Sequence, residues 1–143
     1  MHLPHTLQAP RRILITGGAG LVGSTLLKRA PTGVEIHVTS SFRDPDQSLS
    51  SAIVPPAKRS NHLVGHAIDM NVKSPSGFFN SAKLKRANLA ALPSEVREFI
   101  QKVRDAPGLR WGGDFNPEDP VHIDDGLNLT DPDRWQSKFD SLR

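Results

Sequence analysis

Cysteine and tyrosine are both absent from this chain of 143 residues. Without cysteine, neither a disulfide framework nor a thiolate-bound structural zinc site can form. Long apolar runs are absent too, since no stretch approaches the roughly 20 residues that a membrane-spanning helix needs. These absences argue against a disulfide-stapled domain, a zinc finger and a membrane-spanning helix within this sequence.

Length and composition favour one domain with extensive loops. A chain of this size can bury a proper core but cannot form two independent ones. Its hydrophobic fraction is 36%, and it contains 12 prolines and 11 glycines. We expect a single domain over residues 11–143, preceded by a disordered segment at residues 1–10. Residues 1–12 include basic residues but lead into no apolar core of the kind that a signal peptide has, so a cytoplasmic location on synthesis is expected.

The hydrophobic pattern predicts an α+β fold, with helices packed against a small antiparallel sheet. Strands are expected at residues 13–15, 34–39, 66–71, 109–111 and 121–124, and the last two are expected to pair antiparallel. Helices are expected at residues 21–29, at 81–91, after Ser94 and around Trp135 and Phe139. Ser94 is expected to cap its helix. The apolar positions of that helix recur on one face, namely Val96, Phe99, Ile100 and Val103.

Two histidines and two aspartates are spaced along the chain in a pattern that suits one metal ion. His62 and Asp69 lie seven residues apart, and His122 follows Asp119 by three. Ligand atoms sit about 2 Å from zinc, so His62 and Asp69 must bring their donors within roughly 4 Å of each other. Seven residues of extended strand span about 23 Å, so the chain must bend, and Gly65 permits a tight bend. Three protein ligands with an open fourth position are typical of catalytic zinc.

Four sequence blocks carry a resemblance to a known family. They read Ser-Asn-His-Leu-Val-Gly-His-Ala-Ile-Asp at residues 60–69, Trp-Gly-Gly-Asp-Phe at 111–115, Asp-Pro-Val-His at 119–122 and Ser-Ser-Phe-Arg at 40–43. Their content and order resemble the zinc D-alanyl-D-alanine carboxypeptidase and L-alanyl-D-glutamate endopeptidase family, the M15 peptidases. The resemblance runs from about residue 33 to residue 124. It implies an M15-like fold with a zinc site at the sheet.

The resemblance also implies residue roles. Three residues correspond to the zinc ligands of the family, namely His62, Asp69 and His122. Asp119 corresponds to the carboxylate that takes a proton from the attacking water and passes it to the leaving amine. Arg43 corresponds to the arginine that binds a substrate oxygen and stabilises the tetrahedral oxyanion, a task that suits a permanently charged guanidinium. Substrate contacts are implied for Arg43, Gln47 and Ser60.

Some positions leave alternatives open. Glu118 lies beside Asp119 and becomes the base if the loop register differs, although the motif spacing favours Asp119. Asp124 stands where many relatives carry a longer glutamate, so a contact from this position to the metal ligands would be redirected. His66 falls at a variable place in the pattern and is interpreted as a bystander.

A second motif lies near the N-terminus, where residues 11–23 read Arg-Arg-Ile-Leu-Ile-Thr-Gly-Gly-Ala-Gly-Leu-Val-Gly. Its glycines 17, 20 and 23 resemble the phosphate-binding turn of extended short-chain dehydrogenases and epimerases, and residues 34–39 resemble the second strand of that family. The Tyr-x-x-x-Lys pair of those enzymes cannot occur in a chain without tyrosine. We therefore interpret residues 11–32 as a dehydrogenase-like strand and helix that serve as a packing layer for a peptidase core at residues 33–143.

Charge is unevenly distributed along the chain. Residues 105–143 hold four Lys/Arg against nine Asp/Glu, which favours a cation site in the segment that contains Asp119 and His122. The rest of the chain is basic and gives a pI near 9.6, which suits anionic partners such as cell-wall polymers. No nucleic-acid recognition motif accompanies this charge, so neither a nucleic-acid nor a membrane partner is expected.

The resemblance implies a zinc-dependent peptidase, active as a monomer, that hydrolyses amide bonds in peptidoglycan stem peptides. The expected cofactor is Zn²⁺ and the expected partners are peptidoglycan peptides, which the enzyme meets if it is released or exported to the wall in the manner of an endolysin. Two alternatives remain open. One is a non-catalytic wall-binding protein on a decayed peptidase scaffold, and the other is a nucleotide-binding fragment of a dehydrogenase or epimerase.

Overall fold

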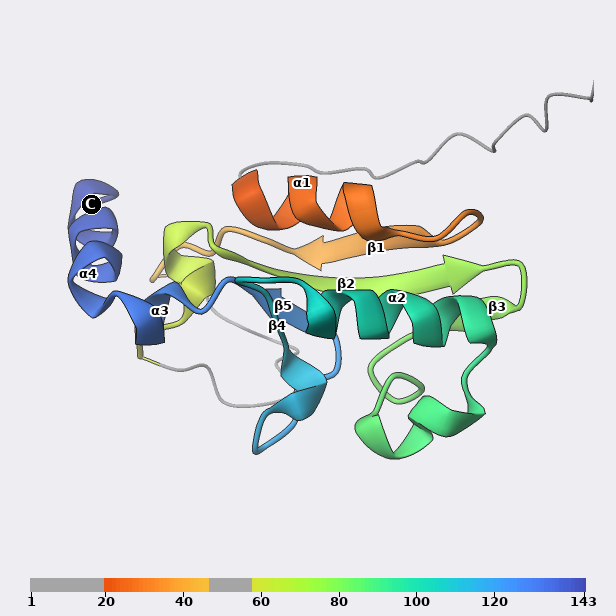
Figure 1. Ribbon diagram of the computed structural model, residues 1–143. Coiled ribbons are helices and arrows are strands. Elements are labelled where there is room, and N and C mark those ends of the chain that lie inside the picture. Colours follow the sequence, from red (N-terminus) through yellow and green to blue (C-terminus); the bar gives the residue numbers. More distant parts are fainter. Residues whose placement is uncertain (1–19, 47–57) are drawn as a thin grey trace, which may run out of the picture.

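A single antiparallel sheet organises the chain, and the computed structural model describes it over residues 20–46 and 58–143 (Figure 1). The strands are β1 (Glu35–Ser40), β2 (Ala67–Ser74), β3 (Gly77–Phe79), β4 (Arg110–Trp111) and β5 (His122–Asp124). They follow the order β1-β2-β5-β4, while β3 folds back as a hairpin onto β2. Every strand pair in the described residues is antiparallel, as the sequence predicts.

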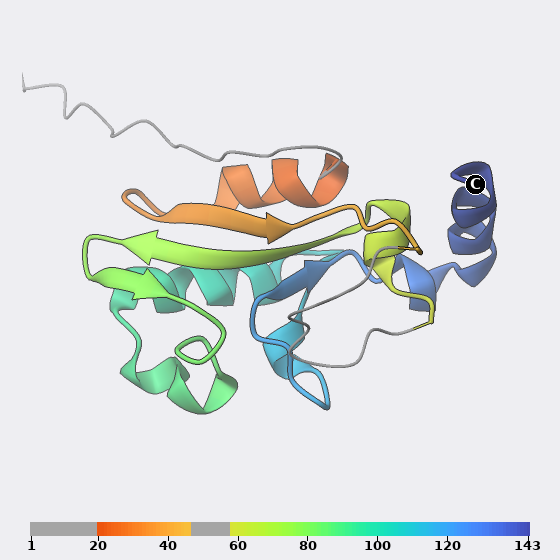
Figure 2. The same ribbon diagram turned by 180° about the vertical axis from the view of Figure 1, so that it is seen from behind.

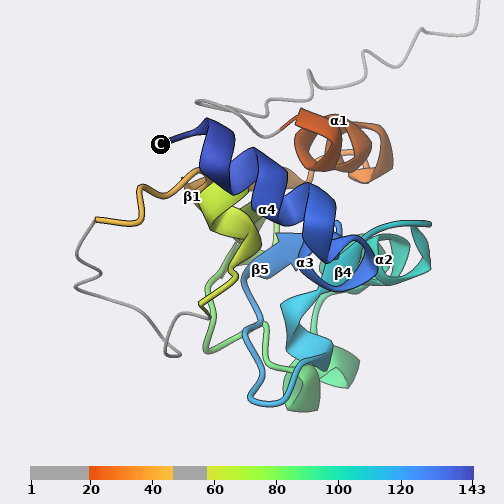
Figure 3. The same ribbon diagram turned by 90° about the vertical axis from the view of Figure 1, so that its left-hand side faces the viewer.

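Helices cover one face of this sheet. The α-helices are α1 (Gly20–Arg29), α2 (Ser94–Asp105), α3 (Leu127–Thr130) and α4 (Pro132–Ser141). Three short 3₁₀ helices accompany them, namely η1 (Asn61–Val64), η2 (Arg86–Ala91) and η3 (Gly112–Asp114). Figure 3 shows α1 and α2 together on one side of the strands, and Figure 2 views the strands from the other side. Neither α1 nor α2 covers the second face of the sheet.

The residues of β2 alternate between the two faces. Ile68, Met70 and Val72 are buried against the helices, whereas Asp69 and Asn71 between them are only partly buried and point to the other face. This period of two follows from the pleat of a strand, which sends successive side chains to opposite sides. Consequently Asp69 faces away from the core although it lies between two core residues.

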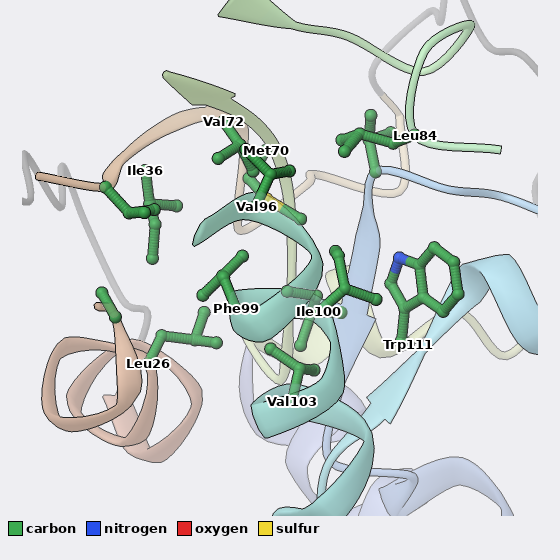
Figure 4. Packing of buried hydrophobic residues seen from close by; sticks show 14 of the residues in the cluster. Leu26, Ile36, Met70, Val72, Leu84, Val96, Phe99, Ile100, Val103 and Trp111 are labelled. Atoms are coloured by element: carbon green, nitrogen blue, oxygen red, sulfur yellow. The ribbon is translucent and has the colours of Figure 1, made fainter. Parts of the chain in front are cut away.

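A single apolar core fills the space between α1, α2 and the sheet (Figure 4). Helix α2 contributes the four residues that the spacing predicts, all of them buried: Val96, Phe99, Ile100 and Val103. Leu26 of α1 and Trp111 of β4 belong to the same cluster. The core thus clamps β1, β2 and β5 in place and gives the opposite face a rigid backing.

Helix α4 packs on a separate, smaller cluster. Val64, Leu127 and Trp135 are its buried members, and Phe139 stacks on Trp135 with ring centroids 5.1 Å apart. This cluster fastens the C-terminal helix to η1, the segment that bears His62. The prediction of a C-terminal helix around Trp135 and Phe139 is confirmed.

Some expected elements differ from the structure. Ser94 is the first helical residue of α2 instead of its cap, because the extended Pro93 occupies the cap position and makes no side-chain hydrogen bond. The strand expected at residues 66–71 continues to Ser74, because its hairpin partner β3 prolongs the pairing. Only residues 86–91 of the helix expected at 81–91 are helical, and they form a 3₁₀ helix. The expectations for residues 1–10 and 13–15 fall outside the described residues.

The predicted helix at residues 21–29 and strand at 34–39 are confirmed as α1 and β1; the helix begins one residue earlier, and the strand is shifted by one residue. In a dinucleotide fold the second strand lies in a parallel sheet, whereas β1 pairs antiparallel with β2. Val22 and Leu26 of α1, together with Ala30 directly after it, pack into the common core. These contacts support the packing-layer interpretation of α1. No helix in the described residues combines the length and hydropathy that spanning a membrane requires.

The two phenylalanines Phe99 and Phe78 provide a direct test of this core. Phe99 is 0% exposed and Phe78 is 45% exposed. We expect Phe99→Ala to lower the free energy of unfolding by about 3–5 kcal/mol, because it removes buried surface and leaves a cavity. Phe78→Ala should change it by less than about 1 kcal/mol. Urea denaturation of both variants measures the difference, and equal losses would contradict the placement of the core.

Candidate metal centre

Three side chains from three segments converge on the open face of the sheet. The Nε2 atom of His62 lies 3.1 Å from Oδ1 of Asp69 and 3.2 Å from Nδ1 of His122. Nδ1 of His122 and Oδ1 of Asp69 are also 3.2 Å apart. The three atoms therefore form a nearly equilateral triangle.

Local geometry explains how His62 reaches this position. It lies on η1, whose first backbone N–H groups are capped by Ser60, because the Oγ of Ser60 accepts a hydrogen bond from the N–H of His62 at 3.3 Å. Gly65 ends η1 in the left-handed conformation at φ +74°, which glycine adopts without steric cost. The predicted bend between His62 and Asp69 is thus confirmed, and Gly65 provides it.

Strand register brings Asp69 and His122 together. They are direct partners across the β2–β5 ladder, so their side chains project from neighbouring positions on the same face. A register shift in β1 between Val38 and Ser40 marks an irregularity beside Asp69. Irregularities of this type bend a strand and frequently occur next to active sites.

Hydrogen bonds fix the tautomer of both imidazoles. Nδ1 of His62 lies 2.6 Å from the carbonyl oxygen of Ser41, which can only accept, so this nitrogen carries the proton. Nε2 of His122 lies 2.9 Å from a carboxylate oxygen of Asp124 and carries the proton for the same reason. In the neutral form of each ring, the nitrogen that faces the triangle is therefore the unprotonated one, and Asp69 adds a carboxylate oxygen. In that form three lone pairs meet at one point.

Such a meeting of lone pairs is repulsive unless a cation or a proton occupies the space between them. Tetrahedral zinc ligands about 2.0 Å from the ion lie about 3.3 Å apart, close to the separations of this triangle. Imidazole nitrogens and carboxylate oxygen are also the ligands that zinc favours in catalytic sites. The residues present therefore fit a zinc ion by donor type, tautomer and spacing, and they form a group that could hold a metal.

The pKa shifts report the same convergence in the metal-free protein. Burial alone would lower the pKa of His122, but hydrogen bonds and charges from Asp124 and Asp69 raise this pKa to about 9. For Asp69, burial would raise the pKa, yet hydrogen bonds from His122 and His62 bring it below its usual range. A proton thus stays in the cluster until a metal ion replaces it.

The turn that carries Arg43 is attached directly to His62. The backbone N–H of Arg43 donates to the carbonyl of His62 at 3.0 Å, and the ring of His62 donates back to Ser41. Burial lowers the pKa of the Arg43 guanidinium and the negative charge of Asp69 opposes that shift, so the two groups interact electrostatically. Arg43 therefore belongs to the surroundings of the triangle.

The two candidate bases occupy different environments. Burial and the negative charge of Asp69 raise the pKa of Asp119, while His122 and His62 lower it. Asp119 therefore interacts electrostatically with all three residues of the triangle. Glu118 instead accepts a hydrogen bond from the backbone N–H of Arg86 at the start of η2. This arrangement favours Asp119 over Glu118 as the group that reaches a substrate at the triangle.

The Trp-Gly-Gly-Asp-Phe block has a steric explanation. A Cβ on Gly112 would overlap the carbonyl oxygen of Asp119 and lie 2.8 Å from the Cβ of His122, and a Cβ on Gly113 would overlap the indole of Trp111. The indole N–H donates to the carbonyl of Pro120 at 2.8 Å. The block therefore brings the loop of Asp119 into close contact with β4.

The remaining predicted residues have varied positions. His66 pairs with Asp125 and takes no part in the triangle, in line with its interpretation as a bystander. The hydroxyl of Ser60 caps η1, and its expected substrate contact stays a prediction. Gln47 lies outside the described residues.

Sequence reasoning missed Arg110, which holds Asp124 by two hydrogen bonds of 2.7 and 2.8 Å. No motif or periodicity in the sequence distinguishes this arginine.

A comparison with known families adds an independent finding. A family model described as D-alanyl-D-alanine carboxypeptidase, from the M15 peptidases, matches residues 55–125. The match supports the M15 peptidase family. The matched segment contains the whole triangle and Asp119, whereas Arg43 precedes it. No curated protein matches the chain. The comparisons do not show the dehydrogenase resemblance, and the alternative of nucleotide binding stays untested because Gly17 lies outside the described residues.

Two glycine variants test the packing beneath the triangle. We expect Gly112→Ala to lower the free energy of unfolding by about 2–3 kcal/mol, because the added methyl group forces the Asp119 loop and β4 apart. Gly108 has φ +78° and nothing within 4 Å of an added Cβ, so Gly108→Ala should cost only about 1 kcal/mol of backbone strain. Thermal and urea unfolding measure both values. A milder effect at Gly112 than at Gly108 would contradict the close contact.

Proposed function

We propose that this protein is a zinc-dependent peptidase that hydrolyses amide bonds in peptidoglycan stem peptides, at a D-Ala-D-Ala or an L-Ala-D-Glu bond. The observation that carries the proposal is the triangle of converging donor atoms from His62, Asp69 and His122. The family match supports the peptidase class and the cell-wall substrate. The bond that is cut depends on subsites that these donors do not define.

The three donors of the triangle hold the zinc ion in this proposal. A zinc ion bound there supplies Lewis acidity and brings the pKa of a coordinated water to about 7. His62 and His122 keep their lone pairs directed at the ion because Ser41 and Asp124 retain the ring protons. Outer hydrogen bonds of this kind orient the ligands and raise their basicity.

Asp119 moves the proton in this reaction. It takes a proton from the attacking water and transfers it to the nitrogen of the scissile amide, so that the amine leaves in its neutral form. Its raised pKa, which arises from burial and from Asp69, makes it a stronger base than a solvated aspartate. Efficient proton transfer requires a pKa near the working pH.

Arg43 stabilises charge during the reaction. The attack of water turns the carbonyl oxygen into an oxyanion, and a guanidinium that remains charged can donate hydrogen bonds to that oxygen or to a terminal carboxylate of the substrate. The hydrogen bond from its backbone N–H to His62 holds the backbone of Arg43 next to the triangle. Removal of one such donor typically costs a factor of about 10²–10³ in rate.

A pair of neighbouring variants tests the base. We expect Asp119→Asn to lower kcat by about 10²–10⁴-fold, because an amide cannot accept the proton, while one equivalent of zinc stays bound. Glu118→Gln is the matched control and should retain nearly full activity, since Glu118 bonds to η2. Steady-state hydrolysis of muropeptides together with zinc analysis measures both effects. Full activity in Asp119→Asn would assign the base elsewhere, with Glu118 the next residue to test.

Metal removal tests the reaction class. We expect a chelator to abolish hydrolysis of muropeptides, and a stoichiometric amount of zinc to restore it, because the donors of the triangle are otherwise occupied by a proton. Mass spectrometry of the digest identifies the bond: loss of a terminal alanine indicates a carboxypeptidase, and a cut after the first alanine indicates an endopeptidase. Zinc binding without any cleavage would favour a wall-binding protein on a decayed peptidase scaffold instead.

A further inference from the structure

A buried carboxylate stands behind the metal-facing side of His122. Asp124 is 2% exposed, and its Oδ2 accepts the Nε2–H of His122 at 2.9 Å. Two donors of Arg110 bind the same carboxylate, Nε to Oδ1 at 2.7 Å and Nη2 to Oδ2 at 2.8 Å. The backbone N–H of Gly126 adds a further bond of 2.9 Å to Oδ1. The carboxylate is therefore fully engaged, and its orientation sets that of the imidazole.

Arg110 is itself held in a fixed position. Its guanidinium lies over the ring of Phe115 at 4.9 Å from the centroid, and a Cβ on Gly126 would lie 3.2 Å from its Nε. The ring of Phe115 also contacts that of His122, with centroids 5.7 Å apart. The last residue of the Trp-Gly-Gly-Asp-Phe block thus touches both the imidazole and the arginine that orients it.

The network continues from Arg110 to the segment that bears His62. Oδ1 of Asn128, on α3, accepts hydrogen bonds from Nη2 of Arg110 at 3.3 Å and from Nδ2 of Asn61 at 3.0 Å. The backbone N–H of Asn128 returns a bond to Oδ1 of Asn61 at 3.0 Å. Asn61 is 1% exposed and directly precedes His62 in η1. A continuous path of side chains therefore joins the two histidines.

We propose that Arg110 and Asn128 are positioning residues of the metal centre, which hold His122 and His62 at the separation that one zinc ion requires. The inference rests on the proposed metal site, but it concerns residues that the motifs do not include. Asn128 lies beyond the family match, which ends at residue 125. In this proposal α3 helps to position the metal ligands and does not serve only as a connection to α4.

The physical reason lies in the shared carboxylate. Without Arg110, the carboxylate of Asp124 loses two of the hydrogen bonds that fix its orientation. The Nε2–H of His122 then bonds to a carboxylate that can rotate, so the direction of Nδ1 of His122 is no longer fixed. Without Asn128, η1 loses its link to Arg110, and Nε2 of His62 is free to shift relative to Nδ1 of His122. Either change weakens metal binding without removing a ligand.

The chain provides a matched control in Arg104. This arginine also pairs with a carboxylate through two of its nitrogens, here that of Asp114, and it lies over an aromatic ring, here Trp111 at 5.0 Å. No described contact joins this pair to the triangle. Loss of Arg104 therefore removes the same types of interaction as loss of Arg110 but leaves the orientation of His122 unchanged.

Zinc affinity, measured by competition with a chromophoric chelator, tests the inference without any turnover. We expect Arg110→Ala and Asn128→Ala to weaken zinc binding by about 10–100-fold, and Arg104→Ala to change it by less than about threefold. Absorption spectra of the cobalt-substituted proteins add a readout of ligand geometry, and they should change for Arg110→Ala and not for Arg104→Ala. If Arg110→Ala fails to fold, Asn128→Ala carries the test, because it removes no charge.

The outcomes separate this inference from the proposed function. Tight zinc binding by the wild type with unchanged affinity in Arg110→Ala and Asn128→Ala would overturn the positioning role and leave the peptidase proposal intact. Equal weakening by Arg104→Ala would overturn it as well, because a general loss of stability would then explain the effect. Absence of zinc binding in the wild type would overturn both proposals together.

Discussion

Convergence of three polar side chains on one point is the constraint on which the rest of this structure depends. One atom each of His62, Asp69 and His122 lies within 3.2 Å of the other two. Ser41 and Asp124 hold one ring proton of each imidazole on the side away from this point. Three lone pairs at this distance repel one another unless a proton or a cation lies between them. The fold therefore holds together a cluster that binds a proton and that has the donors to bind a cation in its place.

The architecture supplies the rigidity that such a cluster needs. In the described residues the larger apolar cluster lies between the sheet and the helices α1 and α2, so the opposite face of β2 and β5 can carry polar groups. Direct pairing of Asp69 with His122 fixes two donors on the rigid sheet. The third donor comes from η1, which is held by its cap, by the small cluster under α4 and by the Asn61–Asn128 pair. Donors on rigid elements keep their geometry better than donors on free loops.

The sequence predicted those features that depend on local spacing. The bend at Gly65, the apolar face of α2 and the antiparallel pair at the end of the sheet all follow from residue types a few positions apart. Features that depend on contacts between distant segments were missed. Arg110 and Asn128 have no local signal, because their role arises only when β4 and α3 meet beside Asp124. The Ser94 cap was wrong because Pro93 determines the start of α2, and β3 was missed because its three residues are too few to show a period.

The most direct test of the central claim is X-ray absorption at the zinc edge on the purified, zinc-loaded protein. The structure predicts one zinc ion with four nitrogen or oxygen ligands at about 2.0–2.1 Å, and outer-shell scattering from two imidazole rings. A shell without imidazole scattering, or a shell of six oxygen ligands, would mean that His62, Asp69 and His122 do not hold the ion. In that case the interpretation of the triangle as a catalytic metal centre would be contradicted.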